Sequence, residues 1–95
     1  MIEVKFVGFP TVYDLIGTDH FHYNFSGQTL EDLITALFSE YGEIMKEALW
    51  DNRIDRLDPA VQIKISGNYV DTISLRDIEL VQNDHVTFMK LLAGG

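Results

Sequence analysis

One stretch of the sequence constrains the fold strongly, because its apolar residues repeat with the period of an α-helix. Thr29 and Asp32 have the spacing of a capping box at its start, and Gly42 stands where a left-handed C-cap is expected. The pattern predicts one long amphipathic helix whose apolar stripe must be buried against another layer. The stripe, at i, i+3, i+4, i+7, i+8 and i+11, consists of Leu30, Leu33, Ile34, Leu37, Phe38 and Tyr41.

Two segments before this helix have the period of a β-strand. Residues 2–6 alternate apolar with charged residues, and residues 20–25 alternate polar with aromatic residues, so we expect two half-buried strands with the aromatic rings inward. Between them, Thr11 and Asp14 fit the capped start of a short helix, and Gly17 fits its end.

The segment 62–73 predicts a β-hairpin around a two-residue turn at Gly67-Asn68, since both residues accept positive φ. When residues are paired outward from this turn, an apolar pair falls on one face of the hairpin and an opposite-charge pair on the other. The expected partners are Ile65 with Val70, and Lys64 with Asp71.

The remaining segments complete an α+β order. Residues 44–49 suggest a short second helix, residues 75–80 a turn of helix, and residues 85–89 a last strand. Strands on either side of one long helix predict a mixed sheet covered on one face by that helix. We expect the first and last strands to be central, parallel neighbours.

Length and composition restrict the class of protein. The 95 residues predict a single domain, and the net charge of −8 makes nucleic acid an unexpected partner while favouring a basic protein partner. The absence of cysteine excludes disulfides and thiolate metal sites and suits a reducing compartment. With no apolar run of membrane-spanning length and no signal-peptide pattern, we expect a cytoplasmic protein that does not bind membranes.

The sequence ends in Leu91-Leu92-Ala93 followed by Gly94 and Gly95. Two glycines have no side chains with which to make contacts and are costly to order, so a structural role for them is improbable. Without Cβ atoms, such an end can thread a narrow channel, and its terminal carboxylate is ionised at neutral pH. We therefore predict a domain over residues 1–90, a flexible tail over residues 91–95, and a reactive terminal carboxylate on Gly95.

Three segments together with the diglycine end resemble the MoaD/ThiS family of ubiquitin-like β-grasp sulfur carriers. The likeness covers nearly the whole chain, with an apparent insertion at residues 43–58, and the small subunit of molybdopterin synthase is the closer match within the family. The segments are Leu15-Ile16-Gly17-Thr18-Asp19, Ile65-Ser66-Gly67-Asn68-Tyr69-Val70 and Asn83-Asp84-His85-Val86-Thr87-Phe88.

The resemblance implies a β-grasp fold and a protein that is not an enzyme alone. It implies that a ubiquitin-activating-type enzyme uses ATP to adenylate the Gly95 carboxylate, and that sulfur then displaces AMP to leave a thiocarboxylate. The large subunit of molybdopterin synthase would receive the tail, and sulfur would pass to the pterin precursor. No cofactor is expected on the chain itself, because ATP is bound by the activating enzyme.

The same comparison suggests roles for individual residues. Gly95 would be the reacting residue, Leu91, Leu92, Ala93 and Gly94 would insert into the partner, and Phe88 would be either a core residue or part of the partner interface. His20 and His22 lie two residues apart on one strand, but without a third ligand we expect no metal site.

The sequence is compatible with several alternatives. The tail lacks the proline or aromatic residue common before the diglycine in the molybdopterin branch, so a tungsten-cofactor, thiamine-pathway or other sulfur carrier is also possible. Two further classes are a ubiquitin-like modifier that forms isopeptide bonds and a β-grasp interaction module whose tail has no chemistry. We also hypothesise that residues 43–58 influence the choice of partner.

Overall fold

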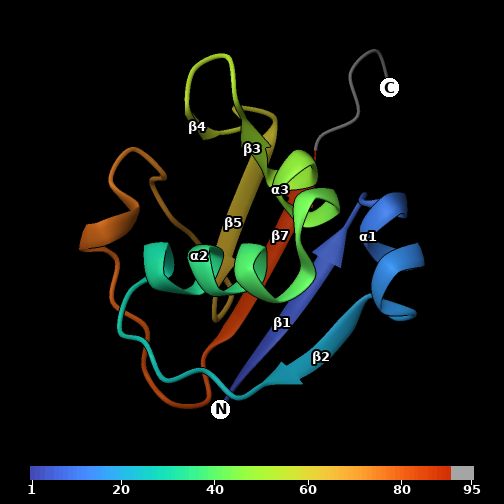
Figure 1. The fold of residues 1–95 in the computed structure, drawn as a ribbon. Coiled ribbons are helices and arrows are strands. Elements are labelled where there is room, and N and C mark those ends of the chain that lie inside the picture. The colour runs from blue at the N-terminus through green and yellow to red at the C-terminus, as the bar shows by residue number, and fades with distance from the viewer. Residues whose placement is uncertain (91–95) are drawn as a thin grey trace.

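A mixed five-stranded sheet forms the centre of the protein in a computed structural model that describes residues 1–90 (Figure 1). The strand order is β2-β1-β7-β5-β6, and β1 runs parallel to β7 while the other neighbours are antiparallel. The predicted central, parallel pairing of the first and last strands is confirmed. The strands are β1 (Ile2–Val7), β2 (His20–Tyr23), β5 (Val61–Ile65), β6 (Asn68–Tyr69) and β7 (His85–Lys90).

The predicted amphipathic helix is α2 (Leu30–Tyr41), which crosses one face of the sheet (Figure 1). Its capping box is present: the Asp32 amide donates to Thr29 Oγ1 at 3.1 Å, and the Thr29 amide donates to Asp32 Oδ2 at 3.1 Å. These bonds satisfy amides that have no partner inside the helix. Both the helix and its start were therefore predicted correctly.

A sheet covered by one long helix is an incomplete description, because residues 1–90 contain three α-helices, of which the two short ones lie in segments where short helices were expected. The additional helices are α1 (Pro10–Ile16) and α3 (Glu43–Leu49), and η1 (Leu75–Asp77) adds one 3-10 turn. The capped start expected at Thr11 is wrong: α1 begins at Pro10, whose fixed φ suits the first helical position, and no side chain caps it. Its predicted end at Gly17, which has the left-handed φ of 89°, is confirmed.

The segment 43–58 contains α3 and a two-stranded ribbon of β3 (Trp50–Asp51) and β4 (Arg56–Leu57). Gly42 ends α2 and begins α3, and its ψ of −154° differs from the left-handed C-cap that we expected. This change of direction lets α3 leave the line of α2 and bury its own apolar side.

The core lies between the inner face of the sheet and the helices. Phe6 of β1 and Phe88 of β7 stack there with ring centroids 5.2 Å apart, and the rings of Phe9 and Phe6 form a T-shaped pair with centroids 5.8 Å apart. The buried hydrophobic residues are Ile2, Val4, Phe6, Phe9, Val12, Leu30, Leu33, Ile34, Leu37, Met45, Ala48, Leu49, Leu57, Val61, Ile63, Val86 and Phe88.

The predicted hairpin exists, but its register is wrong. The observed pairs are Lys64 with Tyr69 and Ile65 with Asn68, so the turn residues are Ser66 and Gly67, with φ of 49° and 89°. Ser66 takes this unusual conformation because its hydroxyl donates to Asp84 Oδ1 at 3.0 Å and its amide donates to the His85 carbonyl at 2.7 Å. These contacts with the start of β7 fix the turn one residue earlier than expected.

Candidate functional site

The candidate site begins where β7 ends, because this strand leads directly to the predicted reactive tail. β7 is hydrogen-bonded on both sides: Met89 is paired with Val7 of β1, and Lys90 is paired with Val61 of β5. A central strand cannot shift without breaking both ladders. The strand that ends at Lys90, the last described residue, is therefore held in register by two neighbouring strands.

Gly8 makes the closest backbone approach to this point. Its φ is 85°, and a Cβ atom built at Gly8 would lie 2.9 Å from the carbonyl oxygen of Lys90. A side chain at this position would therefore meet both backbone strain and a steric clash. Gly8 allows the chain leaving β1 to turn toward α1 while lying directly against the end of β7.

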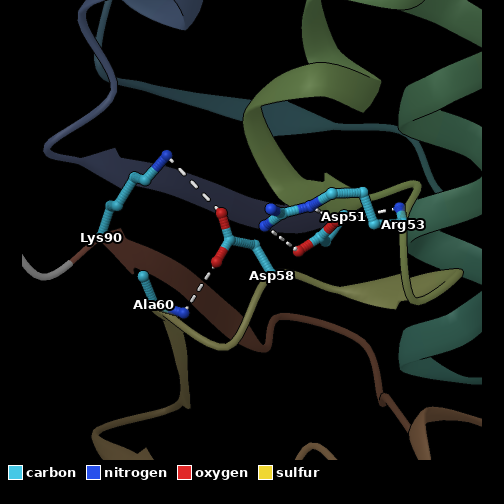
Figure 2. Close-up of polar contacts among 5 residues, drawn as sticks. All are labelled: Asp51, Arg53, Asp58, Ala60 and Lys90. Carbon is cyan, nitrogen blue, oxygen red and sulfur yellow. Dashed lines mark hydrogen bonds and ion pairs between the residues drawn. The ribbon is translucent and has the colours of Figure 1, made fainter.

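Asp58 contacts Lys90 from the other side (Figure 2). Lys90 Nζ lies 3.7 Å from Asp58 Oδ2, while the Ala60 amide donates to Asp58 Oδ1 at 2.9 Å. Both side chains of the ion pair are partly buried, at 35% exposed for Lys90 and 28% for Asp58. The amide bond fixes the carboxylate, so its second oxygen is already oriented toward the lysine.

The backbone amide and carbonyl of Asp58 both form hydrogen bonds. Its amide donates to the Leu49 carbonyl at 2.9 Å, and its carbonyl accepts from the Val61 amide at 2.9 Å. Asp58 thus connects the end of α3, the start of β5 and the end of β7. We call Gly8, Asp58 and Lys90 the tail root.

A second carboxylate drawn in Figure 2, Asp51, belongs to a separate pair. Arg53 donates to both of its oxygens, at 3.2 Å from Nε and 3.1 Å from Nη2. These hydrogen bonds lower the pKa of the Asp51 carboxyl. The Asp51–Arg53 pair closes the turn between β3 and β4, and the structure gives it no contact with Lys90.

The residues predicted to react or to enter a partner lie outside the described residues. They are Leu91, Leu92, Ala93, Gly94 and Gly95. Sequence reasoning missed Gly8 and Asp58, both of which contact Lys90, the residue that precedes the tail. Asp58-Pro59 has the composition of a turn, and nothing in the sequence near Asp58 indicates that it pairs with a lysine 32 positions away. Gly8 likewise carries no sequence signal of its contact with Lys90.

Phe88, for which core and partner interface were both considered, lies in the core. It is 0% exposed and stacks against Phe6, so its side chain offers no surface to a partner. This burial favours the core alternative, and an interface role for the Phe88 side chain stays a prediction. A strand alternates its faces, and Phe88 is on the face covered by α2.

The two strand histidines are engaged separately. His20 Nδ1 lies 2.7 Å from Asp19 Oδ1, and His22 Nε2 lies 3.7 Å from Glu3 Oε2. The hydrogen bond from His20 lowers the pKa of the Asp19 carboxyl. Within residues 1–90, no group of three or more potential ligands is placed to hold a metal ion. No helix of this part of the chain is long and apolar enough to span a membrane.

Several solved structures share this architecture. SAMP1 from Haloferax volcanii matches with a TM-score of 0.75 and 14% identity, over 99% of this chain and 98% of that chain. A chain of the BexX/CysO complex of Amycolatopsis orientalis matches with a TM-score of 0.75 and 18% identity over 100% of both chains. Urm1 from Trypanosoma brucei matches with a TM-score of 0.72 and 22% identity, over 99% of this chain and 95% of that chain.

No protein-family model and no curated protein matches the sequence. The structural likeness at these identities establishes a shared architecture over almost the full length of each chain. Sheet order, the helix across the sheet and the central C-terminal strand agree with the fold expected from the sequence. The protein has the ubiquitin-like β-grasp fold.

Proposed function

We propose that this protein is a sulfur carrier whose C-terminal Gly95 carboxylate is adenylated and converted to a thiocarboxylate. The observation that carries the proposal is the position of Lys90 at the end of a central strand, held between Gly8 and Asp58. A diglycine end starting from so fixed a point can be presented to a partner while the domain stays folded. Five extended residues reach roughly 16 Å from the domain.

The chemistry requires only the terminal carboxylate from this chain. A carboxylate oxygen attacks the α-phosphorus of ATP on the activating enzyme, and pyrophosphate leaves. A sulfur nucleophile at the oxidation level of sulfide then attacks the acyl carbon, the bond to the AMP oxygen breaks, and AMP leaves with its electron pair. Adenylation is needed because an unmodified carboxylate oxygen is a poor leaving group.

The fold supports a carrier or modifier role. One of the similar structures is named small archaeal modifier protein 1, and another belongs to a complex of two proteins. We propose two partners by analogy: a ubiquitin-activating-type adenylating enzyme and the large subunit of molybdopterin synthase. The chain would then be a small subunit without catalysis of its own, acting in the cytoplasm in molybdenum or tungsten cofactor synthesis.

Intact mass spectrometry tests the carrier reaction. The full chain is incubated with ATP, a sulfide-releasing donor and purified adenylating enzyme from the same organism, beside a chain lacking Gly95 and a chain extended by one alanine. We expect a mass gain equal to one oxygen replaced by sulfur in the full chain alone. An unchanged mass, with an enzyme shown to thiocarboxylate another carrier, would contradict the proposal.

The acceptor is tested separately by adding the large subunit of molybdopterin synthase and its pterin precursor to the purified thiocarboxylate. Loss of sulfur from the chain with formation of the dithiolene product would support the molybdopterin pathway. Retention of sulfur would leave the carrier reaction intact but refute this acceptor, and a thiamine-pathway or other acceptor would then be assayed in the same way.

A modifier is the second candidate, favoured by the name of the similar archaeal protein. In that case Gly95 would form an isopeptide bond with a lysine of another protein, and AMP would be displaced by an amine instead of sulfur. Denaturing gels of cell extract with ATP would then show conjugates of higher mass that depend on Gly95. A pure sulfur carrier gives none.

A further inference from the structure

A groove lies beside the tail root, between α1 and α3. It has a volume of about 730 Å³ and is lined by Thr11, Asp14, Leu15, Ile44, Glu47, Ala48 and Lys90. Each helix contributes residues at i, i+3 and i+4, which is the spacing of a single helix face. One face of each helix therefore lines the groove, and Lys90, the last described residue of the chain, also lines it.

The groove exposes apolar residues that the fold does not need on its surface. Leu15 is 37% exposed and Ile44 is 47% exposed, although other residues of the same helices, such as Val12 and Met45, are completely buried. Single exposed apolar residues are common, but two that line one groove on different helices form a continuous apolar surface. The groove can accommodate an apolar side chain between Leu15, Ile44 and Ala48.

Two carboxylates flank this apolar surface. Within the described residues 1–90, neither Asp14 nor Glu47 forms an ion pair or a side-chain hydrogen bond. Lys90, the cation of the groove, is directed to Asp58 instead. The groove is thus acidic as well as apolar, with its negative charge left for an external cation.

Helix stability does not explain why acidic residues occupy positions 14 and 47. Asp14 and Glu47 both lie in the last turn of their helices, where the helix dipole disfavours negative charge by a few tenths of a kcal/mol. A lysine at either position would suit the helix better.

We propose that this α1–α3 groove is the docking site for a segment of the adenylating enzyme that carries one large apolar side chain flanked by lysine or arginine. The apolar side chain fills the space between Leu15 and Ile44, and the cations pair with Asp14 and Glu47. The location supports this occupant, since the enzyme that adenylates Gly95 must bind beside the point where the tail begins. The inference rests on the proposed carrier function and adds where the enzyme recognises the chain.

The test measures ATP–pyrophosphate exchange by the purified adenylating enzyme, with this chain as the variable substrate. Ile44→Ser is compared with Ile54→Ser, because both isoleucines are 47% exposed and Ile54 is outside the groove. We expect Ile44→Ser to raise KM about tenfold with little change in kcat, as for an apolar contact at the centre of an interface. Ile54→Ser should behave as the unmodified chain.

Charge is tested by a second pair of variants. The double variant Asp14→Lys/Glu47→Lys is compared with Glu40→Lys/Glu79→Lys, which changes the net charge equally at exposed acids outside the groove. The groove variant should lose at least tenfold in kcat/KM and most of the salt dependence of KM, whereas the control should lose little. Circular dichroism establishes that each variant is folded.

The outcomes separate this inference from the function on which it rests. If exchange requires Gly95 but both groove variants match their controls, the docking site is refuted and the carrier function stands. If the unmodified chain supports no exchange, the carrier function is refuted and the docking site with it.

Methyl NMR of the isolated chain tests another occupant. We expect deletion of residues 91–95 to leave the methyl signals of Leu15 and Ile44 unchanged. Large shifts at both would assign the groove to the chain's own tail and overturn the proposal.

Discussion

The backbone of Gly8 lies so close to the carbonyl oxygen of Lys90 that a methyl group on Gly8 would be 2.9 Å from it. This contact joins the end of β1 to the end of β7, and β7 leads to the diglycine. Because nothing but a hydrogen fits, the residue at position 8 controls how the two strand ends meet. The relationship makes Gly8 a structural residue of the tail root, although it is distant in sequence from Gly95, whose carboxylate is proposed to react.

Gly8→Ala should destabilise the protein more than Gly17→Ala does. Both glycines have φ near 90°, but a Cβ at Gly17 meets nothing within 4 Å, so that variant has backbone strain without the clash. We expect Gly17→Ala to lower the free energy of unfolding by about 1 kcal/mol and Gly8→Ala by about 2–3 kcal/mol. Urea unfolding measures both. Equal losses would mean that the contact with Lys90 adds no energetic constraint.

Variants of Asp58 should separate its ion pair with Lys90 from its hydrogen bond to the Ala60 amide. Asp58→Asn keeps an oxygen for the Ala60 amide and removes the charge opposite Lys90, so it should cost less than about 1 kcal/mol, the usual range for a partly exposed ion pair. Asp58→Ala also removes the acceptor and should cost about 1–2 kcal/mol. Urea unfolding at low and high salt measures these losses. A larger loss for Asn than for Ala would contradict this division.

Local sequence signals predicted the elements that depend on local interactions. The stripe from Leu30 to Tyr41 and the capping residues Thr29 and Asp32 located α2, because helix periodicity and amide capping act within a few residues. Alternation located β1 and β7. The order of strands around one long helix predicted a mixed sheet, and the parallel pairing of β1 with β7 agrees with that expectation.

The same signals failed where distant residues decide the conformation. Gly67-Asn68 was a reasonable turn by itself, but Ser66 is held by Asp84 and His85, which are 18 and 19 positions away. At the tail root, the contacts of Gly8 and Asp58 with Lys90 are also long-range. The sequences around Gly8 and Asp58 resemble those of ordinary turns, so no sequence pattern reveals that these residues contact Lys90.

Ser66 offers a test of what fixes the hairpin register. Ser66→Ala removes the hydroxyl bond to Asp84 and keeps the unfavourable φ of 49°, so we expect a loss of about 1 kcal/mol. Ser66→Gly also removes the hydroxyl, but glycine adopts this φ readily, so the loss should be smaller. Thermal unfolding ranks the two variants. A Gly variant less stable than the Ala variant would show that backbone conformation is not limiting here.

Phe88→Ala should act on stability before it acts on binding. The ring is completely buried against Phe6, so its removal should cost about 3–5 kcal/mol, enough to threaten folding of a domain this small. Val7→Ala, at a 44% exposed position of the adjacent strand, is the control and should change stability by about 0.5 kcal/mol or less. A stable Phe88→Ala protein that failed only in partner binding would instead support an interface role for this side chain.

The capping box of α2 should make stability depend on pH in the acid range. The amides of Gln28 and Thr29 donate to the Asp32 carboxylate, and these bonds lower the pKa of its carboxyl in the folded protein. A carboxyl whose pKa is lower when folded binds its proton more readily when unfolded. The stabilisation of the folded protein by ionised Asp32 is therefore complete at pH values above the ordinary carboxyl pKa of 3.8. It is lost as the pH falls through the lower pKa that Asp32 has in the folded protein.

Asp32→Asn removes this titration and should be less stable than the unmodified chain at neutral pH. Urea unfolding between about pH 2 and pH 6 should show the two stability curves converging as the solution is acidified, because the protonated carboxyl loses its advantage over the amide. Thr29→Val, which removes the reciprocal bond without removing a titrating group, should instead lie below the unmodified chain at every pH. Parallel curves for Asp32→Asn and the unmodified chain would mean that the charge on Asp32 does not stabilise the start of α2.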